Sequence, residues 1–248
     1  MALRRVSMVL MGVVAALALL VSACSDGEAT EVVVETPTAT QTGTPSPTTT
    51  PSRTPTSTPE AIPTEAPGAE IVRGLQEFVS EYGYPSGAGF ARLRIPTLGV
   101  DSLASSRLVG SDGVMAAPGG PADVVWYDMS LWSGMGGAPG GGGNAIFSGH
   151  VNYAAYVPYA EVNYRGQGVF SQLGQLAIGD IVEVEYGGQT LRYGVVSVRD
   201  LAADGAGWAE VWSNRDGVDS ITLYTCGGDF DTATREYSHR IVVRAQRL

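Results

Sequence analysis

Short runs in which apolar and polar residues alternate are the feature that most constrains the fold of this chain. Residues 91–95 read Ala-Arg-Leu-Arg-Ile, and residues 182–186 read Val-Glu-Val-Glu-Tyr. A period of two places one set of side chains on the buried face of a strand and the other set on its solvent face. Gly187-Gly188 then separates the second run from residues 191–195, where the alternation continues, and this arrangement is typical of a β-hairpin.

Helical patterns are few, which narrows the fold class further. Apolar residues fall on one helical face between Glu70 and Tyr82, so we expect a packing helix there. Two further β-rich runs lie at 221–225 and 241–245. Short strands joined by glycine-rich turns predict an all-β domain, built as a single antiparallel barrel or sandwich with short helices.

Composition divides the 248 residues into three segments. Residues 1–24 have the features of an export signal, because Arg4 and Arg5 precede an apolar run that is too short for a comfortable membrane span. Residues 25–67 are dominated by Thr, Pro and Ser and carry too few apolar side chains to form a core, so we expect a disordered linker. Residues 68–248 contain every predicted element and form the expected folded domain.

The end of the export signal, Leu20-Val-Ser-Ala-Cys24, resembles a bacterial lipobox, which implies cleavage before Cys24 and lipid attachment to it. An uncleaved helical anchor and secretion with loss of Cys24 are the alternatives. All three export the domain, so we expect it on the extracellular face of the bacterial cell membrane. The net charge of −10 and the scattered basic residues argue against a nucleic-acid partner, which needs clustered cations.

The residues of the predicted domain that could carry chemistry form a short set. Cys226 is its only cysteine, and His150 and His239 are the only histidines of the chain. A disulfide with Cys24 would tie a processing site to the core, so Cys226 is expected to be a free thiol. Cys226 ends a predicted strand and is followed by two glycines, a more accessible position than that of a structural cysteine.

Arg240 opens the last β-rich run, and antiparallel pairing of this run with residues 221–225 would place it beside Cys226. Alternation puts Tyr224 and Cys226 on one face of their strand and lets Arg240 share that face. His239 competes with His150 as the imidazole of such a site, but alternation turns it to the opposite side. Spacing alone leaves open both a Cys/His/Arg site and a buried thiol with surface arginines.

Three motifs, taken together, resemble the sortase family. Residues 222–226, Thr-Leu-Tyr-Thr-Cys, resemble the sortase signature Thr-Leu-x-Thr-Cys. Residues 143–150 are similar to the segment that ends in the sortase histidine, and residues 239–245 resemble the strand that carries the sortase arginine. The likeness covers roughly residues 89–248 and is most similar to the actinobacterial class E/F branches.

The resemblance implies an eight-stranded sortase β-barrel and a cysteine transpeptidase with Cys226 as nucleophile, His150 as acid/base and Arg240 as the charge-stabilising partner. It implies two reaction partners: a sorting peptide of the Leu-Pro-x-Thr-Gly kind, cleaved through a thioacyl intermediate, and an envelope amine. The membrane would be a third partner, through the N-terminal anchor. A hydrolytic cysteine peptidase and a non-catalytic lipoprotein adhesion module are the alternatives.

We also expect Tyr224, Thr225 and Trp208 to contact the substrate, although Trp208 could instead anchor a short helix to the barrel. No cofactor is expected, since no cluster has metal-ligand spacing. Some sortases bind calcium, but Asp229 and Asp231 do not form a recognisable ligand loop.

The chain departs from the sortase pattern in its long linker and in a tyrosine-rich segment at 152–167 that follows His150. Ser148 also stands where many members have alanine. The glycine-rich residues 134–143 lack the Lys and Ser/Thr of a phosphate loop, so we expect a flexible loop close to the site.

Overall fold

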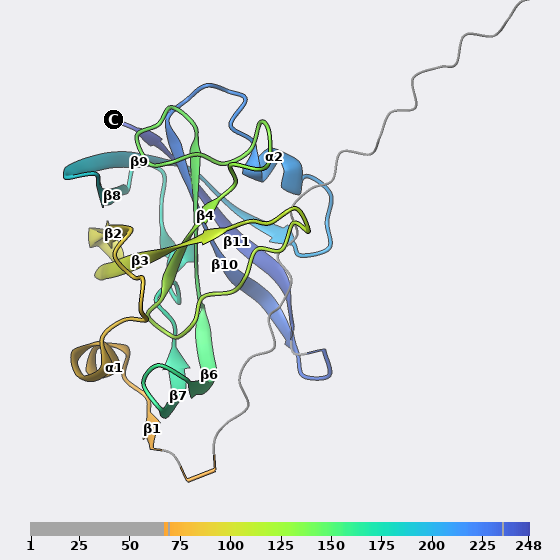
Figure 1. Cartoon of the computed structure of the whole chain (residues 1–248). Coiled ribbons are helices and arrows are strands. Elements are labelled where there is room, and N and C mark those ends of the chain that lie inside the picture. The colour runs from red at the N-terminus through yellow and green to blue at the C-terminus, as the bar shows by residue number, and fades with distance from the viewer. Residues whose placement is uncertain (1–66, 69, 235) are drawn as a thin grey trace, which may run out of the picture. The chain divides into compact units, whose positions relative to one another are not determined.

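Eight strands close into a barrel in the computed structural model, which describes residues 67–68, 70–234 and 236–248 (Figure 1). The order around the barrel is β10-β11-β9-β8-β2-β3-β4-β5. These strands are β2 (Ala91–Ile95), β3 (Val100–Leu108), β4 (Val124–Asp128), β5 (Asn144–Gly149), β8 (Ile181–Tyr186), β9 (Gln189–Ala202), β10 (Ser220–Asp231) and β11 (Glu236–Arg247). The all-β, eight-stranded barrel expected from the sequence is confirmed.

The barrel is mixed rather than purely antiparallel, which corrects one part of the expectation. β3 pairs parallel with β4, and β5 pairs parallel with β10. Parallel neighbours require a long crossover connection. Residues 109–123 supply one such connection, between β3 and β4. The alternation pattern could not predict it, because a period of two is the same in parallel and antiparallel strands.

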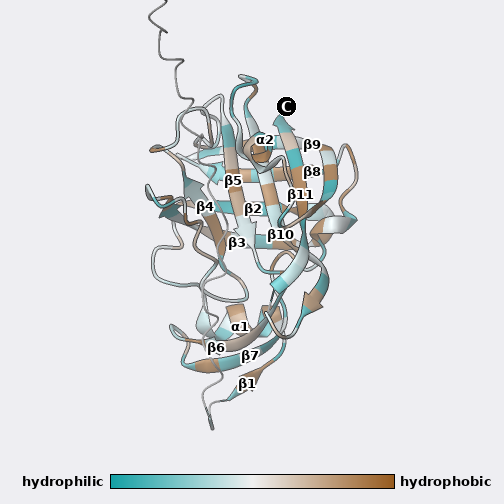
Figure 2. Cartoon of the chain, turned by 90° about the vertical axis from the view of Figure 1, so that its right-hand side faces the viewer, coloured by the Kyte–Doolittle hydropathy of each residue, from teal (hydrophilic) through white to brown (hydrophobic). Residues whose placement is uncertain are grey.

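The inside of the barrel is filled by one alternating set of side chains. On β10, Ile221 and Leu223 point inward and are fully buried, as are Val243 and Ala245 on β11. Figure 2 shows apolar residues alternating with polar ones along these strands. At about 25 cal/mol per Å² of buried apolar area, this core is the main stabilising contribution to the fold.

A second apolar cluster covers the outer face of the same strands. Tyr224 of β10 and Val242 of β11 pack there against Tyr127 and against Trp212 of the short helix α2 (Trp208–Trp212). The strands β10 and β11 are therefore buried on both faces over part of their length. The outer face is the one that also carries Cys226.

A separate three-stranded sheet lies beside the barrel, in the order β1-β7-β6, together with helix α1 (Leu75–Tyr82) (Figures 1 and 2). Its strands are β1 (Ile71–Val72), β6 (Asn152–Val157) and β7 (Val162–Gln167). The predicted helix over 70–82 therefore begins only at Leu75. Ile71 and Val72 are β-branched and pair with β7, and Gly74 stands at the N-cap, so tertiary pairing overrides the helical pattern.

The predicted export signal, Cys24 and the predicted linker up to residue 66 lie outside the described residues. In the part of the chain that is described, no helix has both the length and the apolar character needed to cross a bilayer.

Candidate active site

Cys226 and Arg240 face each other across a strand pair. β10 and β11 pair antiparallel, and Cys226 lies directly opposite Arg240 in the register. Directly opposed residues of an antiparallel pair project from the same face. The thiol and the guanidinium therefore share one face, as the spacing of the two runs predicted.

His150 reaches the same place through a parallel strand pair. β5 runs alongside β10 with Ser148 opposite Tyr224, and the Thr225 hydroxyl donates a hydrogen bond of 2.7 Å to the Gly149 carbonyl. Cys226 and His150 each lie two residues beyond the Ser148–Tyr224 pair. The register thus brings His150, just after the end of β5, next to Cys226 in the middle of β10.

A cavity of about 480 Å³ brings the three predicted catalytic residues together. Its lining includes Tyr127, Ser148 and Tyr224. Its other lining residues are Met115, Ala117, Pro118, Gly149, His150, Val151, Asn152, Tyr153, Ala154, Thr225, Cys226, Phe230, Thr232, Glu236, Tyr237 and Arg240. Such a volume suits a short peptide segment or a small ligand.

The Cys226 thiol is free and partly exposed, so it is open to a substrate. Burial raises the pKa of this thiol above its ordinary value, and the negative charge of Glu236 raises it further. The positive charge of Arg240 acts in the opposite direction. The resting thiol is therefore mostly protonated at neutral pH, and Arg240 is the group that favours its ionisation.

The His150 ring donates from Nε2 to the Pro118 carbonyl oxygen at 2.9 Å. Burial lowers the pKa of His150, the Pro118 hydrogen bond raises it, and the charge of Arg107 lowers it, with burial dominant. His150 is therefore mostly neutral at neutral pH. Its ring lies in a T-shaped contact with the ring of Tyr153, with centroids 5.1 Å apart.

The Arg240 guanidinium is anchored at one end. Its Nη1 donates to the carbonyl oxygens of Tyr237 at 2.8 Å and His239 at 2.9 Å. Among the residues that the structure describes, its Nε and Nη2 have no hydrogen-bond partner, so these donors can serve a substrate oxygen.

The chain is similar to known proteins over most of its described residues. A family model described as a sortase domain matches residues 93–248. The chain belongs to the sortase family. A comparison with curated proteins found no match.

Several solved structures of sortases are similar to this chain. The Clostridium perfringens sortase D5 transpeptidase is 16% identical, and the match covers 70% of this chain and 95% of that one, with a TM-score of 0.44. Sortase E1 from Streptomyces coelicolor, solved with a tripeptide in the active site, is 21% identical, with coverages of 66% and 91% and a TM-score of 0.45. A lid mutant of sortase A from Corynebacterium diphtheriae is 20% identical, with coverages of 70% and 76% and a TM-score of 0.43.

Two residues considered from the sequence lie elsewhere in this sortase. Trp208 stacks on Trp212 at a centroid distance of 5.2 Å and packs against the outer apolar cluster, away from the lining of the Cys226 cavity. His239 lies opposite Gly227 and contacts Ser238, and it does not line the cavity either. The expectation that Trp208 contacts the substrate is thus not supported by its position, whereas Tyr224 and Thr225 do line the cavity.

The glycine-rich segment 134–143 is also placed differently from the expectation. It precedes β5, whereas His150 follows β5, so the strand separates the loop from the site. Its backbone is held by Trp126, which donates to the Gly137 carbonyl, and by Tyr193, which accepts from the Gly140 amide. The loop therefore supports the far end of the barrel and does not border the active site.

The sequence did not reveal most of the cavity wall of this sortase. Phe230 and Tyr237 pack together on the β10–β11 hairpin, and Asn152 donates to the Tyr237 hydroxyl at 2.5 Å. Tyr153 comes from the tyrosine-rich segment that the sequence had singled out. The hairpin residues gave no signal, because their role depends on how two distant segments meet.

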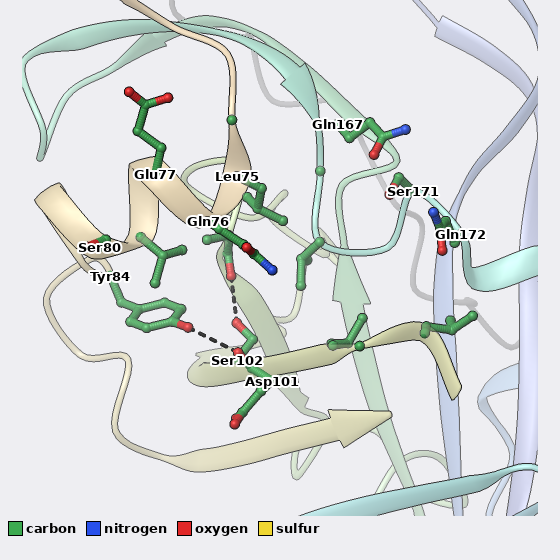
Figure 3. Close-up of a pocket in the computed structure, with 18 residues that line it drawn as sticks. Leu75, Gln76, Glu77, Ser80, Tyr84, Asp101, Ser102, Gln167, Ser171 and Gln172 are labelled. Atoms are coloured by element: carbon green, nitrogen blue, oxygen red, sulfur yellow. Dashed lines mark hydrogen bonds between the residues drawn. The ribbon is translucent and has the colours of Figure 1, made fainter. Parts of the chain in front are cut away.

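A larger cavity, of about 660 Å³, lies between α1 and β3 and holds none of the predicted site residues (Figure 3). Its lining includes Gln76, Tyr84 and Gln172, and Tyr84 donates to the Asp101 carbonyl there. No group of three metal-binding side chains occurs in the described part of the chain.

Proposed function

We propose that this sortase is a cysteine transpeptidase that cleaves a Leu-Pro-x-Thr-Gly-type sorting peptide and joins the threonyl carbonyl to an envelope amine. Sortases as a family are cysteine transpeptidases that act on sorting signals and amine acceptors, and this chain belongs to that family. The observation that carries the proposal is the direct pairing of Cys226 with Arg240 in the cavity that His150 also lines.

In the first half of the reaction, the Cys226 thiolate attacks the carbonyl carbon of the Thr-Gly bond. The carbonyl oxygen becomes an oxyanion, and the free donors of Arg240 stabilise it. The carbon–nitrogen bond then breaks, and the departing glycine amine takes a proton from the His150 imidazolium. A thioester between Cys226 and the threonyl group remains.

In the second half, the acceptor amine attacks the thioester carbon and gives a proton to His150. Arg240 stabilises the second oxyanion in the same way. The carbon–sulfur bond breaks, and the thiolate and the imidazolium are both regenerated. The net reaction exchanges one amine for another at a constant number of peptide bonds.

The protonation of the resting site limits how much enzyme is ready to react. The pKa of Cys226 is raised and that of His150 is lowered, so the neutral thiol and neutral imidazole predominate between the two values. The reactive thiolate–imidazolium pair holds the same single proton and is a minor form. Protonation of the thiolate at low pH abolishes this reactive pair, and so does loss of the imidazolium proton at high pH. A plot of kcat/KM against pH should therefore be bell-shaped.

A ligation assay with the full chain tests the proposal. The enzyme is mixed with a labelled Leu-Pro-x-Thr-Gly peptide panel and an oligoglycine amine, and products are identified by mass spectrometry. The chain contains no lysine, since all fifteen of its basic residues are arginine, so no side-chain amine of the enzyme competes as acceptor. We expect a ligated product and a thioester adduct on Cys226.

The Cys226→Ala variant should lose ligation by roughly 10⁵-fold or more, as when other enzymes lose their nucleophile. Persistent turnover in that variant would end the proposal. Hydrolysed peptide without ligated product would instead identify a peptidase. An inert thiol, with no adduct from any peptide, would identify a binding module.

We further propose that the protein acts on the outer face of the bacterial membrane, held there by lipid on Cys24 or by an N-terminal helix. Its similarity to class E/F sortases remains a prediction. Labelling of cells with a lipid precursor, compared between the natural chain and Cys24→Ala, distinguishes the two anchors.

A further inference from the structure

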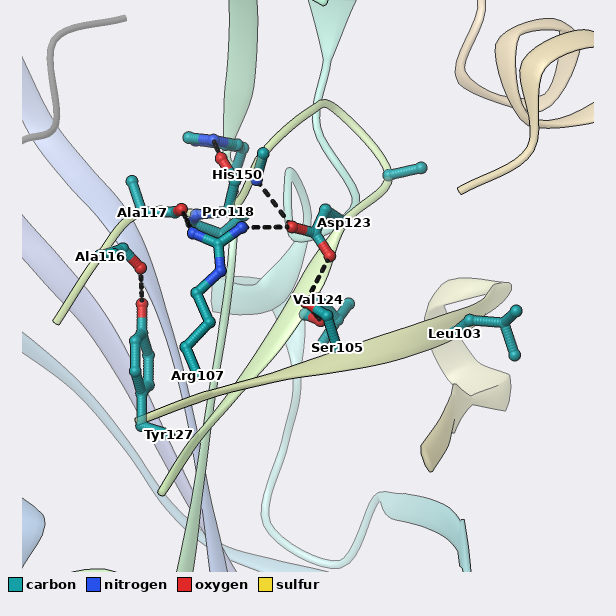
Figure 4. Close-up of polar contacts among 12 residues, drawn as sticks. Leu103, Ser105, Arg107, Ala116, Ala117, Pro118, Asp123, Val124, Tyr127 and His150 are labelled. Atoms are coloured by element: carbon teal, nitrogen blue, oxygen red, sulfur yellow. Dashed lines mark hydrogen bonds and ion pairs between the residues drawn. The ribbon is translucent and has the colours of Figure 1, made fainter. Parts of the chain in front are cut away.

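The loop before β4 is held in place residue by residue beside the His150 ring (Figure 4). The Tyr127 hydroxyl donates to the Ala116 carbonyl at 2.7 Å, and Arg107 donates to the Ala117 carbonyl. His150 donates to the Pro118 carbonyl. The next amide, that of Gly119, donates to Asp123. Residues 116–119 are thus each held by a different side chain.

Asp123 is the centre of this arrangement. Its side chain is completely buried, and it accepts from the Gly119 amide at 2.7 Å and from the Ser105 hydroxyl at 3.0 Å. Arg107 forms an ion pair with it at 3.1 Å. Burying a carboxylate is unfavourable by several kcal/mol unless it is paired and hydrogen-bonded. The three donors here offset part of that penalty, although burial still raises the pKa of Asp123 above its ordinary value.

Arg107 links this buried carboxylate to the loop. Its Nη2 contacts Asp123, and its Nη1 contacts the carbonyl of Ala117, the residue before Pro118. Because the guanidinium is planar and rigid, the position of Asp123 fixes the position of that carbonyl. The peptide unit that accepts from His150 is therefore set by the Arg107–Asp123 pair on one side and by the Gly119 amide on the other.

The Pro118 carbonyl determines which tautomer of His150 is present. A carbonyl oxygen can only accept, so Nε2 must carry the proton. In the neutral ring Nδ1 is then the basic nitrogen, and it is the atom that gains and loses a proton. The T-shaped contact with Tyr153 limits rotation of the His150 ring. A loose Pro118 carbonyl would allow both tautomers and several ring orientations.

We propose that Asp123 and Arg107 are positioning residues of this sortase, which hold the Pro118 carbonyl where it locks His150 as the Nε2–H tautomer with Nδ1 free to exchange the proton. The inference rests on the proposed role of His150 as acid/base. It assigns a positioning role to an ion pair between a buried carboxylate and a partly exposed arginine, neither of which contacts the thiol or the arginine of the site.

Nuclear magnetic resonance reads the tautomer without requiring turnover. In a His239→Gln background of the full chain, His150 is the only histidine, so long-range ¹H–¹⁵N spectra report it alone. At a pH above its pKa we expect one protonated and one unprotonated nitrogen signal, assigned to Nε2 and Nδ1. Asp123→Asn and Arg107→Gln should move both signals toward the average that marks tautomer exchange.

Kinetics give the second readout. Both variants should lower kcat by about 10- to 100-fold, the range expected when a catalytic group is misplaced by about 1 Å, with KM changed by less than about twofold. Arg107→Lys retains the ion pair and should recover part of kcat. The matched control is Asp101→Asn, which removes the ion pairs that Asp101 of β3 makes with Arg92 and Arg94 of β2 and should leave both readouts unchanged.

Each outcome decides the proposal. A folded Asp123→Asn or Arg107→Gln that keeps the wild-type tautomer spectrum or kcat overturns it, and so does an equal effect of Asp101→Asn. If Asp123→Asn does not fold, the partly exposed Arg107 carries the test through Arg107→Gln and Arg107→Lys. A wild-type enzyme that ligates no peptide but responds as expected in the spectra would overturn the proposed function and leave the positioning role standing.

Discussion

The two halves of β10 differ sharply although they belong to one continuous strand. From Ser220 to Thr225 every residue is buried, with β5 on one side and β11 on the other. From Cys226 to Asp231 the strand is partly or fully exposed, and in the described register it pairs with β11 alone, with a shift between Gly227 and Phe230.

Cys226 stands at the boundary between these halves. The β5 strand ends at Gly149, so Cys226 is among the first residues of β10 without a strand on that side. The rigid half fixes the backbone of the thiol, and the loss of the neighbouring strand opens the cavity next to it. A nucleophile at the preceding position on the same face, that of Tyr224, would be buried. One placed after Cys226 would lie on the less constrained part of the hairpin.

The largest loss of ligation activity is expected from changes at Arg240, which faces the exposed half of β10. Arg240→Gln is expected to lower kcat/KM by about 10²- to 10³-fold, as does loss of an oxyanion donor in other enzymes, while the melting temperature stays nearly constant. Arg240→Lys keeps the charge but loses the fork of donors, so its kcat/KM should lie between that of the wild type and that of Arg240→Gln. Steady-state ligation assays measure both variants.

The control for this prediction is Arg244→Gln on the same face of β11. Arg244 contacts Ser220 and the Val211 carbonyl, away from the cavity, so it should affect stability more than ligation. Equal losses of activity in the two glutamine variants would remove the special role of position 240.

A substitution in the buried half of β10 should lower the stability of the fold without changing the reactivity of Cys226. Leu223→Ala removes a fully buried side chain from the barrel interior, and we expect the free energy of unfolding to fall by about 2–5 kcal/mol. Urea denaturation measures this change. In the folded fraction, the alkylation rate of Cys226 should match the wild type, because Leu223 points to the other face. A large change in that rate would mean that the two halves are not separable.

The smallest effect is expected at Glu236, an exposed residue that lines the cavity. Its negative charge raises the pKa of Cys226, so Glu236→Gln should lower that pKa and increase the thiolate fraction at neutral pH. Because an exposed charge interacts by about 1 kcal/mol or less, the alkylation rate should rise by less than about fivefold. The basic limb of the pH–rate profile should move to lower pH.

Asp231 is the matched control for Glu236, since it lies opposite Glu236 in the hairpin but does not line the cavity. Asp231→Asn should leave the alkylation profile unchanged. A slower reaction in Glu236→Gln would reverse the sign that the electrostatics predict and would point to a direct role of the carboxylate in holding the thiol.

The parts of this fold that the sequence predicted are those set by local pattern. The alternating runs became β2, β8, β9, β10 and β11, and Cys226 and Arg240 could be paired because one hairpin joins their strands. The family motifs added His150. The separate sheet was not predicted, because β1 is a two-residue strand that exists only through its pairing with β7.

The surroundings of His150 could not be predicted for a similar reason. Residues 116–119 read Ala-Ala-Pro-Gly, which has no periodicity and no side chain that could carry chemistry. Their importance lies in backbone carbonyls, and these are organised by Arg107 on β3 and Asp123 just before β4. A single sequence records which side chains are present but not which carbonyl each of them will reach.

The attachment of β1 to β7 has a mechanical consequence. The chain enters the described domain just before Ile71, and the Asn163 amide donates to the Glu70 carbonyl at 2.8 Å. Tension applied from the N-terminal side would load these contacts first. β7 is joined by a hairpin to β6, whose first residues, Asn152 and Tyr153, line the cavity. A pulling force on this strand would therefore be passed through β7 and β6 to the wall of the active site.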